Sequence, residues 1–189
     1  MIDNTEQVLK FCQDVDDGDT FIYTEMLDRS KKSGNNGVRL LKTFYHRSKQ
    51  EFLDQIPTIK YLCDLSKVRA YTRLAPRSYK KVGENFTRLV VEASLTNNWA
   101  GMKSLYNRAC GTTKPLEKMW LFDVDVINDY TSELEQLLRD KEVLLDKIPS
   151  RKGVHFITRP FQLNPAILPS TISLHKDNPT NLYIPDSAE

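Results

Sequence analysis

The sequence predicts an α+β fold, a two-layer arrangement of helices on sheet, formed by a single domain over residues 1–189. Short segments in which apolar and polar residues alternate indicate strands, and longer segments with apolar residues at helical spacing indicate helices between them. Hydrophobic residues make up 40% of the chain and charged residues 28%, which is typical of soluble globular proteins. A chain of 189 residues is also long enough to bury a sizeable core in one domain.

Residues 1–115 are predicted to form an N-terminal α/β unit. Its elements follow from the apolar patterns and from the glycine- and proline-bearing breaks between them. First we expect a short helix over residues 5–14, and then strands over 20–27 and 39–47 joined by a polar turn at 31–39. A helix over 49–67, kinked near Pro57, follows them. The unit ends with a strand over 68–75 that ends at residues 76–78 and a helical stretch over 79–108 that is broken near residues 96–101.

Residues 116–189 are predicted to form a second part, which carries the candidate site. A strand over residues 118–127 leads to a helix over 130–148 with a broad apolar stripe, made by Leu134, Leu137, Leu138, Val143, Leu144 and Leu145. A second strand lies within residues 149–161, irregular chain covers 162–169, and a hairpin around 176–181 completes the part. This strand–helix–strand order predicts a core sheet with a right-handed crossover helix.

Asp123 and Asp125 stand one residue apart in the otherwise apolar stretch FDVDV. Because side chains alternate along a strand, both carboxylates project from one face, with their Cα atoms about 7 Å apart. Asp is depleted in strands and like charges repel, so this pair requires an explanation. A divalent cation such as Mg²⁺ or Mn²⁺ supplies one, since these ions prefer carboxylate oxygens. A solvated sheet face is the competing interpretation, and the Asp-x-Asp pattern alone favours it.

A basic turn precedes the second strand of this part and consists of Ser150, Arg151, Lys152 and Gly153. Backbone amides and cationic side chains in such a turn can hold phosphate oxygens. His155 follows at the second position of the strand, and Arg159 is expected on the same face further along. The competing interpretation of His155 is a core histidine bonded to a backbone carbonyl.

A third acidic residue, Asp177, precedes Pro179 in the stretch KDNPTN. It is either a further metal ligand or the residue that shapes a tight turn, and the local sequence slightly favours the turn. Asp186 is the alternative third carboxylate. Arg73 and Arg77 are expected to be exposed and are candidates for contacts with phosphate.

The segments FDVD, SRKGVH and HKD together resemble, in order and spacing, the three motifs of the archaeo-eukaryotic primase superfamily. The resemblance covers about residues 119–185, and more loosely residues 68–78. It implies a primase-like core in which three carboxylates, here Asp123, Asp125 and Asp177, hold two Mg²⁺ or Mn²⁺ ions. It also implies that phosphates of the incoming nucleotide contact a set made up of Ser150, Arg151, Lys152, His155 and Arg159.

The activity that this resemblance implies is transfer of nucleotides from nucleoside triphosphates on a single-stranded DNA or RNA template, as in DNA replication. Asp123, Asp125 and His155 would be the catalytic residues. The sequence shows no zinc cluster and no helicase module, so a helicase or another replication protein is an expected partner. The alternatives are a non-catalytic nucleic-acid-binding protein that retains the fold and a small interaction protein with an incidental Asp-x-Asp.

Composition limits the remaining classes. The net charge of +2 provides no strong global field for nucleic acid, although a local basic patch is compatible with it. Cys12, Cys63 and Cys110 are scattered, which argues against a disulfide framework or a CxxC zinc site and favours a cytoplasmic location. No apolar run is long enough for a transmembrane helix, and residues 1–11 lack the pattern of a signal peptide.

Overall fold

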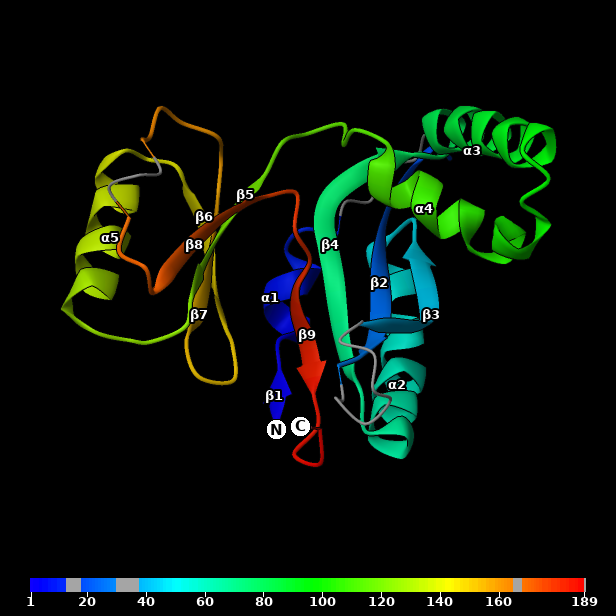
Figure 1. Cartoon of the computed structure of the whole chain (residues 1–189). Coiled ribbons are helices and arrows are strands. Elements are labelled where there is room, and N and C mark those ends of the chain that lie inside the picture. Colours follow the sequence, from blue (N-terminus) through cyan, green and yellow to red (C-terminus); the bar gives the residue numbers. More distant parts are fainter. Residues whose placement is uncertain (13–17, 30–37, 165–167, 189) are drawn as a thin grey trace.

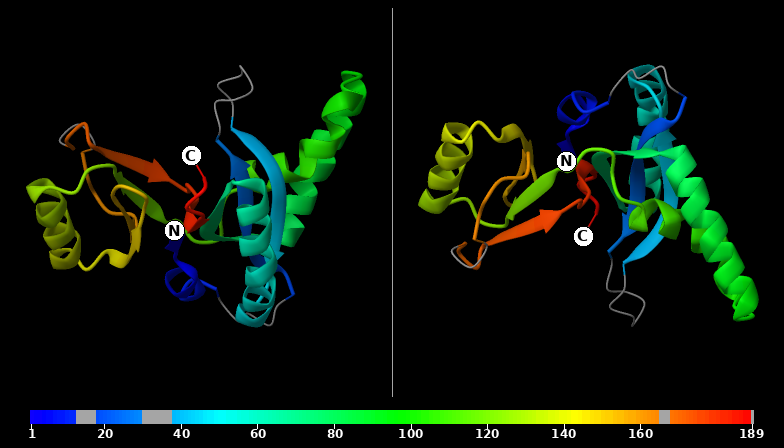
Figure 2. Two further views of the ribbon diagram at one scale, coloured as in Figure 1. Left: turned by 90° about the horizontal axis from the view of Figure 1, so that it is seen from below. Right: turned by 90° about the horizontal axis from the view of Figure 1, so that it is seen from above.

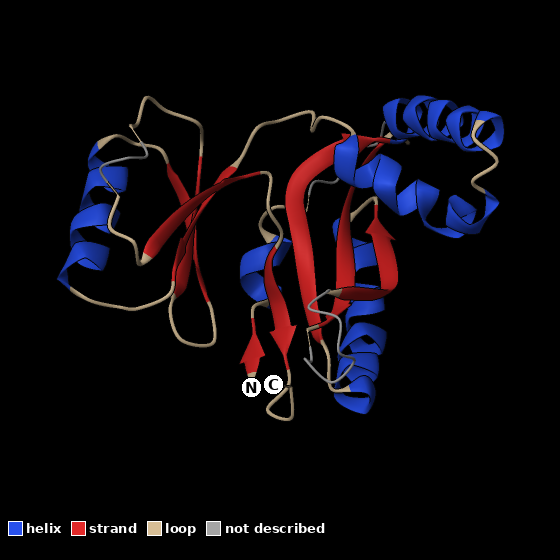
Figure 3. Ribbon diagram, viewed as in Figure 1, coloured by secondary structure: helices blue, strands red, loops and turns tan. Residues whose placement is uncertain are grey.

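The computed structural model describes residues 1–12, 18–29, 38–164 and 168–188. Within these residues the chain forms two antiparallel sheets that lie side by side, with helices packed on them (Figure 1; Figure 3). The α+β class predicted from the sequence is therefore confirmed. No helix among these residues is both long and apolar enough to cross a membrane.

The first sheet has the strand order β1–β9–β4–β2–β3, and every neighbouring pair is antiparallel. Its strands are β1 (Ile2–Asp3), β2 (Thr20–Asp28), β3 (Arg39–His46), β4 (Arg69–Ser78) and β9 (Thr180–Ile184). The predicted pairing of the strands at 20–27 and 39–47 is confirmed by β2 and β3. Most of the turn predicted between them lies outside the described residues, as does the end of the first predicted helix, of which α1 covers Thr5–Leu9.

Helices cover both faces of the first sheet. The helix α2 (Lys49–Ser66) begins at Ser48, whose hydroxyl accepts a hydrogen bond from the Glu51 amide, and it continues through the exposed Pro57. Its buried side chains pack against one face of β2 and β4 in the largest core cluster. The other face is covered at one end by α3 (Tyr79–Leu95) and α4 (Leu105–Thr112), which the short helix η2 (Trp99–Ser104) joins. The predicted helical stretch and its break are thus confirmed, and α3 projects from the body of the molecule (Figure 2).

The strand β4 extends beyond the end expected from the sequence. Residues 76–78 were predicted to end it, but β4 continues to Ser78. Its pairing with β2 shifts register between Phe21, opposite Arg77, and Tyr23, opposite Arg73, so Pro76 lies in a bulge. A bulge residue makes no ladder hydrogen bond, which is why proline is tolerated there.

The second sheet has the order β6–β7–β5–β8, again with antiparallel neighbours only. Its strands are β5 (Trp120–Val124), β6 (Leu144–Pro149), β7 (Val154–Thr158) and β8 (Ile172–Lys176), and the helix α5 (Asp129–Asp140) covers its outer face (Figure 1). Phe122 and Val124 of β5 point to α5, where they pack with Leu134 and Leu138. Leu121, on the other face, packs in the core that the second sheet shares with the first.

The helix predicted over residues 130–148 was too long. It ends at Asp140, and Leu144–Pro149 form the strand β6. Glu142 adopts a left-handed conformation (φ 54°), which ends the helix without a glycine. Since β5 and β6 both run antiparallel to β7, they are parallel to each other. The helix is therefore a crossover, but it leads to a strand that β7 separates from β5.

The hairpin predicted over residues 170–185 was wrong. The strand β8 pairs with β5 in the second sheet, whereas β9 pairs with β4 and β1 in the first. The chain passes from one sheet to the other at residues 177–179, where Asp177 has a left-handed backbone (φ 62°). The boundary near residue 115 consequently does not separate the sheets, because β9 belongs to the first.

Candidate functional site

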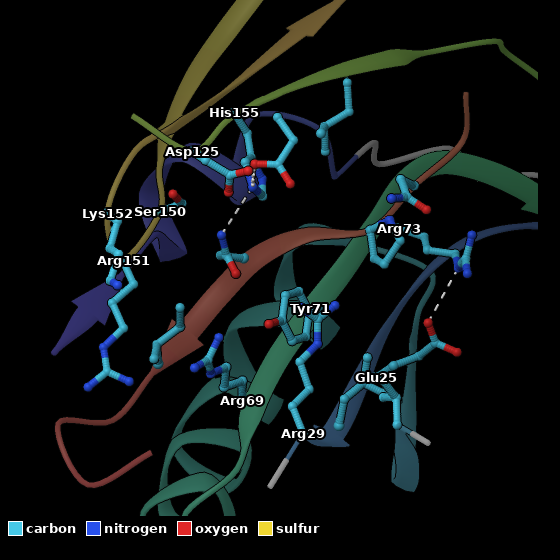
Figure 4. Close-up of a pocket in the computed structure, with 18 residues that line it drawn as sticks. Glu25, Arg29, Arg69, Tyr71, Arg73, Asp125, Ser150, Arg151, Lys152 and His155 are labelled. Atoms are coloured by element: carbon cyan, nitrogen blue, oxygen red, sulfur yellow. Dashed lines mark hydrogen bonds and ion pairs between the residues drawn. The ribbon is translucent and has the colours of Figure 1, made fainter. Parts of the chain in front are cut away.

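A cavity of about 510 Å³ lies between the two sheets, and both sheets contribute to its walls. Figure 4 shows the labelled side chains in two groups on either side of the strand β9. One wall carries Asp123, Asp125, His155 and the basic turn at residues 150–152. The other carries Glu25, Arg29, Arg69, Tyr71 and Arg73. The first two motifs identified in the sequence therefore meet at one cavity.

Asp123 and His155 are direct neighbours, because β5 and β7 pair in a register that sets one opposite the other. Nε2 of His155 lies 3.2 Å from Oδ1 of Asp123. The hydrogen bond from this histidine is the main reason that the pKa of Asp123 lies below its ordinary value; partial burial opposes the shift.

His155 is only 6% exposed, and both of its ring nitrogens have partners. Nδ1 lies 2.8 Å from Oγ1 of Thr180 on β9, and the amide nitrogen of Asn181 lies 3.4 Å from Nε2. Because a carboxylate only accepts hydrogen bonds, Nε2 of His155 is the donor in the contact with Asp123. The histidine thus holds the Asp123 carboxylate and connects the two sheets.

Asp125 follows the last residue of β5, and its backbone amide donates to the Thr171 carbonyl at 3.2 Å. Its side chain is exposed at the cavity (Figure 4). It makes no side-chain hydrogen bond or ion pair within the described part of the chain. The two aspartates therefore differ, since Asp123 is held by a histidine and Asp125 is open to a ligand.

The basic turn joins β6 to β7 and is held by two hydrogen bonds. The Ser150 amide donates to the Gly153 carbonyl (3.0 Å), and the Gly153 amide donates to Oγ of Ser150 (3.1 Å). A Cβ atom at Gly153 would lie 1.7 Å from the carbonyl oxygen of Val124, so only glycine fits. This close packing of the turn on the end of β5 places Lys152 and Asp125 on the same cavity.

The turn is also tied to the first sheet. The buried side chain of Asn4 donates to the carbonyls of Pro149 and Asn181, each at 2.9 Å. Arg151 donates to the carbonyl of Ala188. Lys152 is exposed and makes no ion pair among the described residues, so it is the cation of the turn that is available to a ligand.

The opposite wall contains residues that the sequence interpretation did not single out, except for Arg73. Register pairs Glu25 with Tyr71, so these side chains share a face with the neighbouring Arg69 and Arg73. Arg73 forms an ion pair with Glu25 (3.3 Å), and the guanidinium of Arg29 lies 4.6 Å from the centre of the Tyr71 ring. The alternation of Arg69, Tyr71 and Arg73 along one predicted strand was the signal that could have identified this wall.

Asp177 does not lie in this cavity. Its carboxylate pairs with Arg77, and its backbone carbonyl accepts from Arg73 at 2.7 Å. Burial raises the pKa of Asp177, while Arg77 acts in the opposite direction. The expectation that Arg77 is exposed was wrong: its side chain is fully buried and also donates to the carbonyls of Ala75 (3.0 Å) and Cys110 (3.3 Å).

Two other candidates also lie outside the cavity. Arg159 follows the far end of β7, where its amide donates to the Val143 carbonyl at 2.9 Å. Asp186 is exposed and pairs with the N-terminal amine of Met1. Neither residue lines the cavity with Asp123 and Asp125.

The three-carboxylate metal site implied by the resemblance does not fit this arrangement. No group of three histidine, cysteine, aspartate or glutamate residues that could hold a metal ion occurs in residues 1–12, 18–29, 38–164 and 168–188. Asp123 and Asp125 remain as a carboxylate pair on the cavity. Such a pair fits Mg²⁺ that is bound partly by substrate phosphates, because this ion commonly takes only one or two protein carboxylates in nucleotide sites.

Comparison with known proteins provides no further assignment. No family model matches the chain. No curated protein and no solved structure matches it at a significant level either. The fold and the cavity are therefore the basis for any functional inference.

Proposed function

We propose that this chain is a primase-like nucleotidyltransferase core that binds a nucleoside triphosphate with a divalent cation in the cavity and transfers nucleotides on a single-stranded template. One observation carries the proposal. The segments FDVD and SRKGVH, which are distant in sequence, meet on one wall of a cavity whose other wall carries arginines.

The charge of the cavity supports binding of a polyphosphate. Five basic side chains line it among the described residues, against three acidic ones. Lys152 is available on the turn, and Arg69 and Arg73 lie on the facing wall. A triphosphate between the walls would receive charge-assisted hydrogen bonds from both sheets, which are stronger than neutral ones.

The carboxylate pair is the place for the cation that accompanies a triphosphate. Asp123 and Asp125 would hold Mg²⁺ or Mn²⁺, with phosphate oxygens as the remaining ligands. When bound, the cation would neutralise charge at the transferred phosphorus and orient the attacking hydroxyl. His155 donates to Asp123 and so fixes the position of this carboxylate. In this structure His155 is a positioning residue, because both ring nitrogens already have partners.

The reaction forms a bond between a 3′-oxygen and the α-phosphorus of the nucleotide, while the bond to pyrophosphate breaks. The hydroxyl proton leaves to solvent, and the leaving pyrophosphate keeps the negative charge. Lys152 and the facing arginines lie where they would neutralise that charge. A single strand of DNA or RNA supplies the template, and a helicase or another replication protein is a fitting partner.

A second candidate function rests on the position of Asp177. Because this carboxylate pairs with Arg77 outside the cavity, the chain could bind nucleotide and single strands without catalysing transfer. The two functions differ in incorporation of nucleotide, since both include binding.

The test measures nucleoside-triphosphate binding and template-dependent incorporation in the presence of Mn²⁺. Lys152→Ala should weaken nucleotide binding about ten- to a hundredfold, the effect of one charge-assisted phosphate contact. Asp125→Asn should abolish incorporation with the fold unchanged, because its side chain has no bonding partner in the described protein. Lys141→Ala, at an exposed lysine after α5, is the control and should change neither. Binding without incorporation in the parent protein would favour the second candidate, and absence of both would refute the proposal.

A further inference from the structure

A second cavity of about 280 Å³ lies at the opposite end of β5 from Asp125. Its walls include Pro115, Lys118, Trp120, Pro160, Lys176 and Asp177. These residues come from the start of β5, the ends of β7 and β8 and the connection that follows α4. The cavity combines an aromatic ring, two prolines and two lysines.

We propose that this second cavity holds one base of a single-stranded nucleic acid, with the neighbouring phosphates on Lys118 and Lys176. The inference rests on the proposed function, because it assigns a contact to the template. It adds a site that is separate from the first cavity and to which only Lys176 and Asp177 of the motif HKD contribute.

Trp120 supplies the surface on which a base would stack. Its ring is half-buried, and the Phe161 ring supports it at a centroid distance of 5.7 Å. The ammonium group of Lys176 lies 5.4 Å from the centre of the Trp120 ring. A base would replace this cation on the ring, and the displaced lysine could then contact a phosphate. Stacking on aromatic side chains tolerates any base, which suits a template of variable sequence.

The charges at this cavity favour a polyanion. Neither Lys118 nor Lys176 forms an ion pair in the described part of the protein, in contrast to Lys147, which pairs with Glu135 at 2.6 Å. Asp177 is the acidic residue of the cavity wall, and its charge is compensated by Arg77. The charges of Lys118 and Lys176 therefore remain unpaired at this cavity among the described residues, which favours a negatively charged ligand.

Size and position agree with a single base. Ligand pockets of proteins typically measure roughly 300–1,000 Å³, so this cavity is suited to one flat group rather than to a whole nucleotide chain. Asp177 lines the second cavity, and the next two residues, Asn178 and Pro179, line the first. A strand with one base at Trp120 would thus lead directly over this segment to the nucleotide cavity.

The experiment uses the fluorescence of Trp120. The chain has two tryptophans, and Trp99 is exposed in η2, away from both cavities. A Trp99→Phe protein, titrated with oligothymidylate, should show saturable quenching of Trp120 at oligonucleotide concentrations where thymidine monophosphate gives little. A Trp120→Phe protein, in which Trp99 alone reports, should show none. Equal quenching in both proteins, or no quenching although anisotropy shows oligonucleotide binding, would overturn the inference.

A second measurement covers the lysines. Lys118→Ala should weaken oligothymidylate binding severalfold and reduce the slope of log affinity against log salt by about 0.7, the value for one phosphate contact on a single strand. Lys141→Ala, which removes an exposed lysine that lines neither cavity, should leave the slope unchanged. If polyglutamate quenches Trp120 as strongly as the oligonucleotide does, the cavity binds anions without regard to bases and the inference fails.

Failure of this inference can be distinguished from failure of the proposed function. Nucleotide binding and incorporation are measured at the first cavity with the parent protein. If these persist while Trp120 does not respond to oligonucleotide, only the second site is refuted. If Trp120 responds but nucleotide does not bind, the strand site stands and the enzyme proposal fails.

Discussion

Asp123 and Asp177 received the same role from the sequence, but the structure places them in opposite environments. Asp123 lies on the first cavity, is half-buried, and stands beside His155, which lowers its pKa. Asp177 lies at the connection between the sheets, beside a fully buried arginine, with a pKa raised by burial. Residue type and order within a motif therefore do not determine the environment in which a carboxylate lies. The partner of a carboxylate and its exposure decide whether it can receive a ligand.

The largest effect is expected at the Asp177 pair. Arg77→Met removes a buried guanidinium that serves Asp177 and two carbonyls, and it leaves these acceptors without their donor. Loss of one partner from a buried pair typically lowers the free energy of unfolding by about 3–5 kcal/mol. Urea denaturation measures this change. Arg159→Met, at an exposed arginine, is the control and should change stability by less than about 0.5 kcal/mol. A loss below about 1 kcal/mol for Arg77→Met would show that Asp177 does not depend on this pair.

Gly153→Ala should disturb the cavity wall that carries Asp123. The added Cβ meets the Val124 carbonyl oxygen, so the basic turn must move away from β5. Overpacking of this kind costs about 1–3 kcal/mol of unfolding free energy, and nucleotide affinity should fall with it. Gly83→Ala is the matched control: Gly83 lies inside α3 with open space around it, and alanine should stabilise the helix by about 0.5–1 kcal/mol. Equal stability changes at the two positions would contradict the packing argument.

The support of His155 can be tested with two buried threonines. Thr180→Val removes the hydroxyl bonded to Nδ1 and should lower the free energy of unfolding by about 1–2 kcal/mol. Thr158 is equally buried, but its hydroxyl has no hydrogen-bond partner within the described structure. Thr158→Val should therefore be neutral or stabilising. Thermal or urea denaturation of both variants decides the matter, and a harmless Thr180→Val would remove Thr180 from the positioning of His155.

The smallest effect is the pH dependence, in which the two aspartates differ in sign. The pKa of Asp123 is lowered in the folded state, so its contribution to stability is present above the ordinary value of 3.8 and is lost as the pH falls through the lowered pKa. The pKa of Asp177 is raised, so ionisation penalises the folded state above that pKa, and the penalty disappears as the pH falls toward 3.8. In Asp123→Asn the free energy of unfolding should therefore fall less steeply than in the parent protein as the pH drops below 3.8. In Asp177→Asn the loss of unfolding free energy that the parent protein shows as the pH rises above 3.8 should be absent.

Apolar patterns in the sequence predicted those helices and strands whose formation depends mainly on neighbouring residues. The alternation in β2 and β3 and the apolar spacing of α2 were sufficient to identify these elements. The extension of the predicted helix into β6 has an equally local reason. Leu144 and Leu145 continue the apolar stripe of α5, and Glu142 ends the helix in a left-handed conformation that no glycine announces. Helical periodicity could therefore not reveal the strand.

Long-range pairing accounts for the remainder. The position of β9 depends on hydrogen bonds to β1 and β4, and nothing in the stretch KDNPTN distinguishes a hairpin from a passage between two sheets. The ion pair of Asp177 with Arg77 is a consequence of this passage between the sheets, because the passage places Asp177 beside Arg77. In contrast, Asp123 and His155 could be brought together from strand alternation and motif order. The facing wall was missed because its residues carry no motif, although Arg69, Tyr71 and Arg73 alternate.

The strand β9 has a consequence for how this chain can be divided. It follows every strand of the second sheet in sequence, yet it is the strand that joins β1 to β4, with Ile2 opposite Ile184 and Ala70 opposite Tyr183. A chain cut after residue 115 would leave β1 without its partner and the C-terminal fragment with a strand that has no sheet. Mixed together, the fragments should reassociate by insertion of β9 between β1 and β4, as a peptide strand adds to an open sheet. The two sheets are thus suited to fragment complementation, in which the cavity between them would be assembled only when both pieces are present.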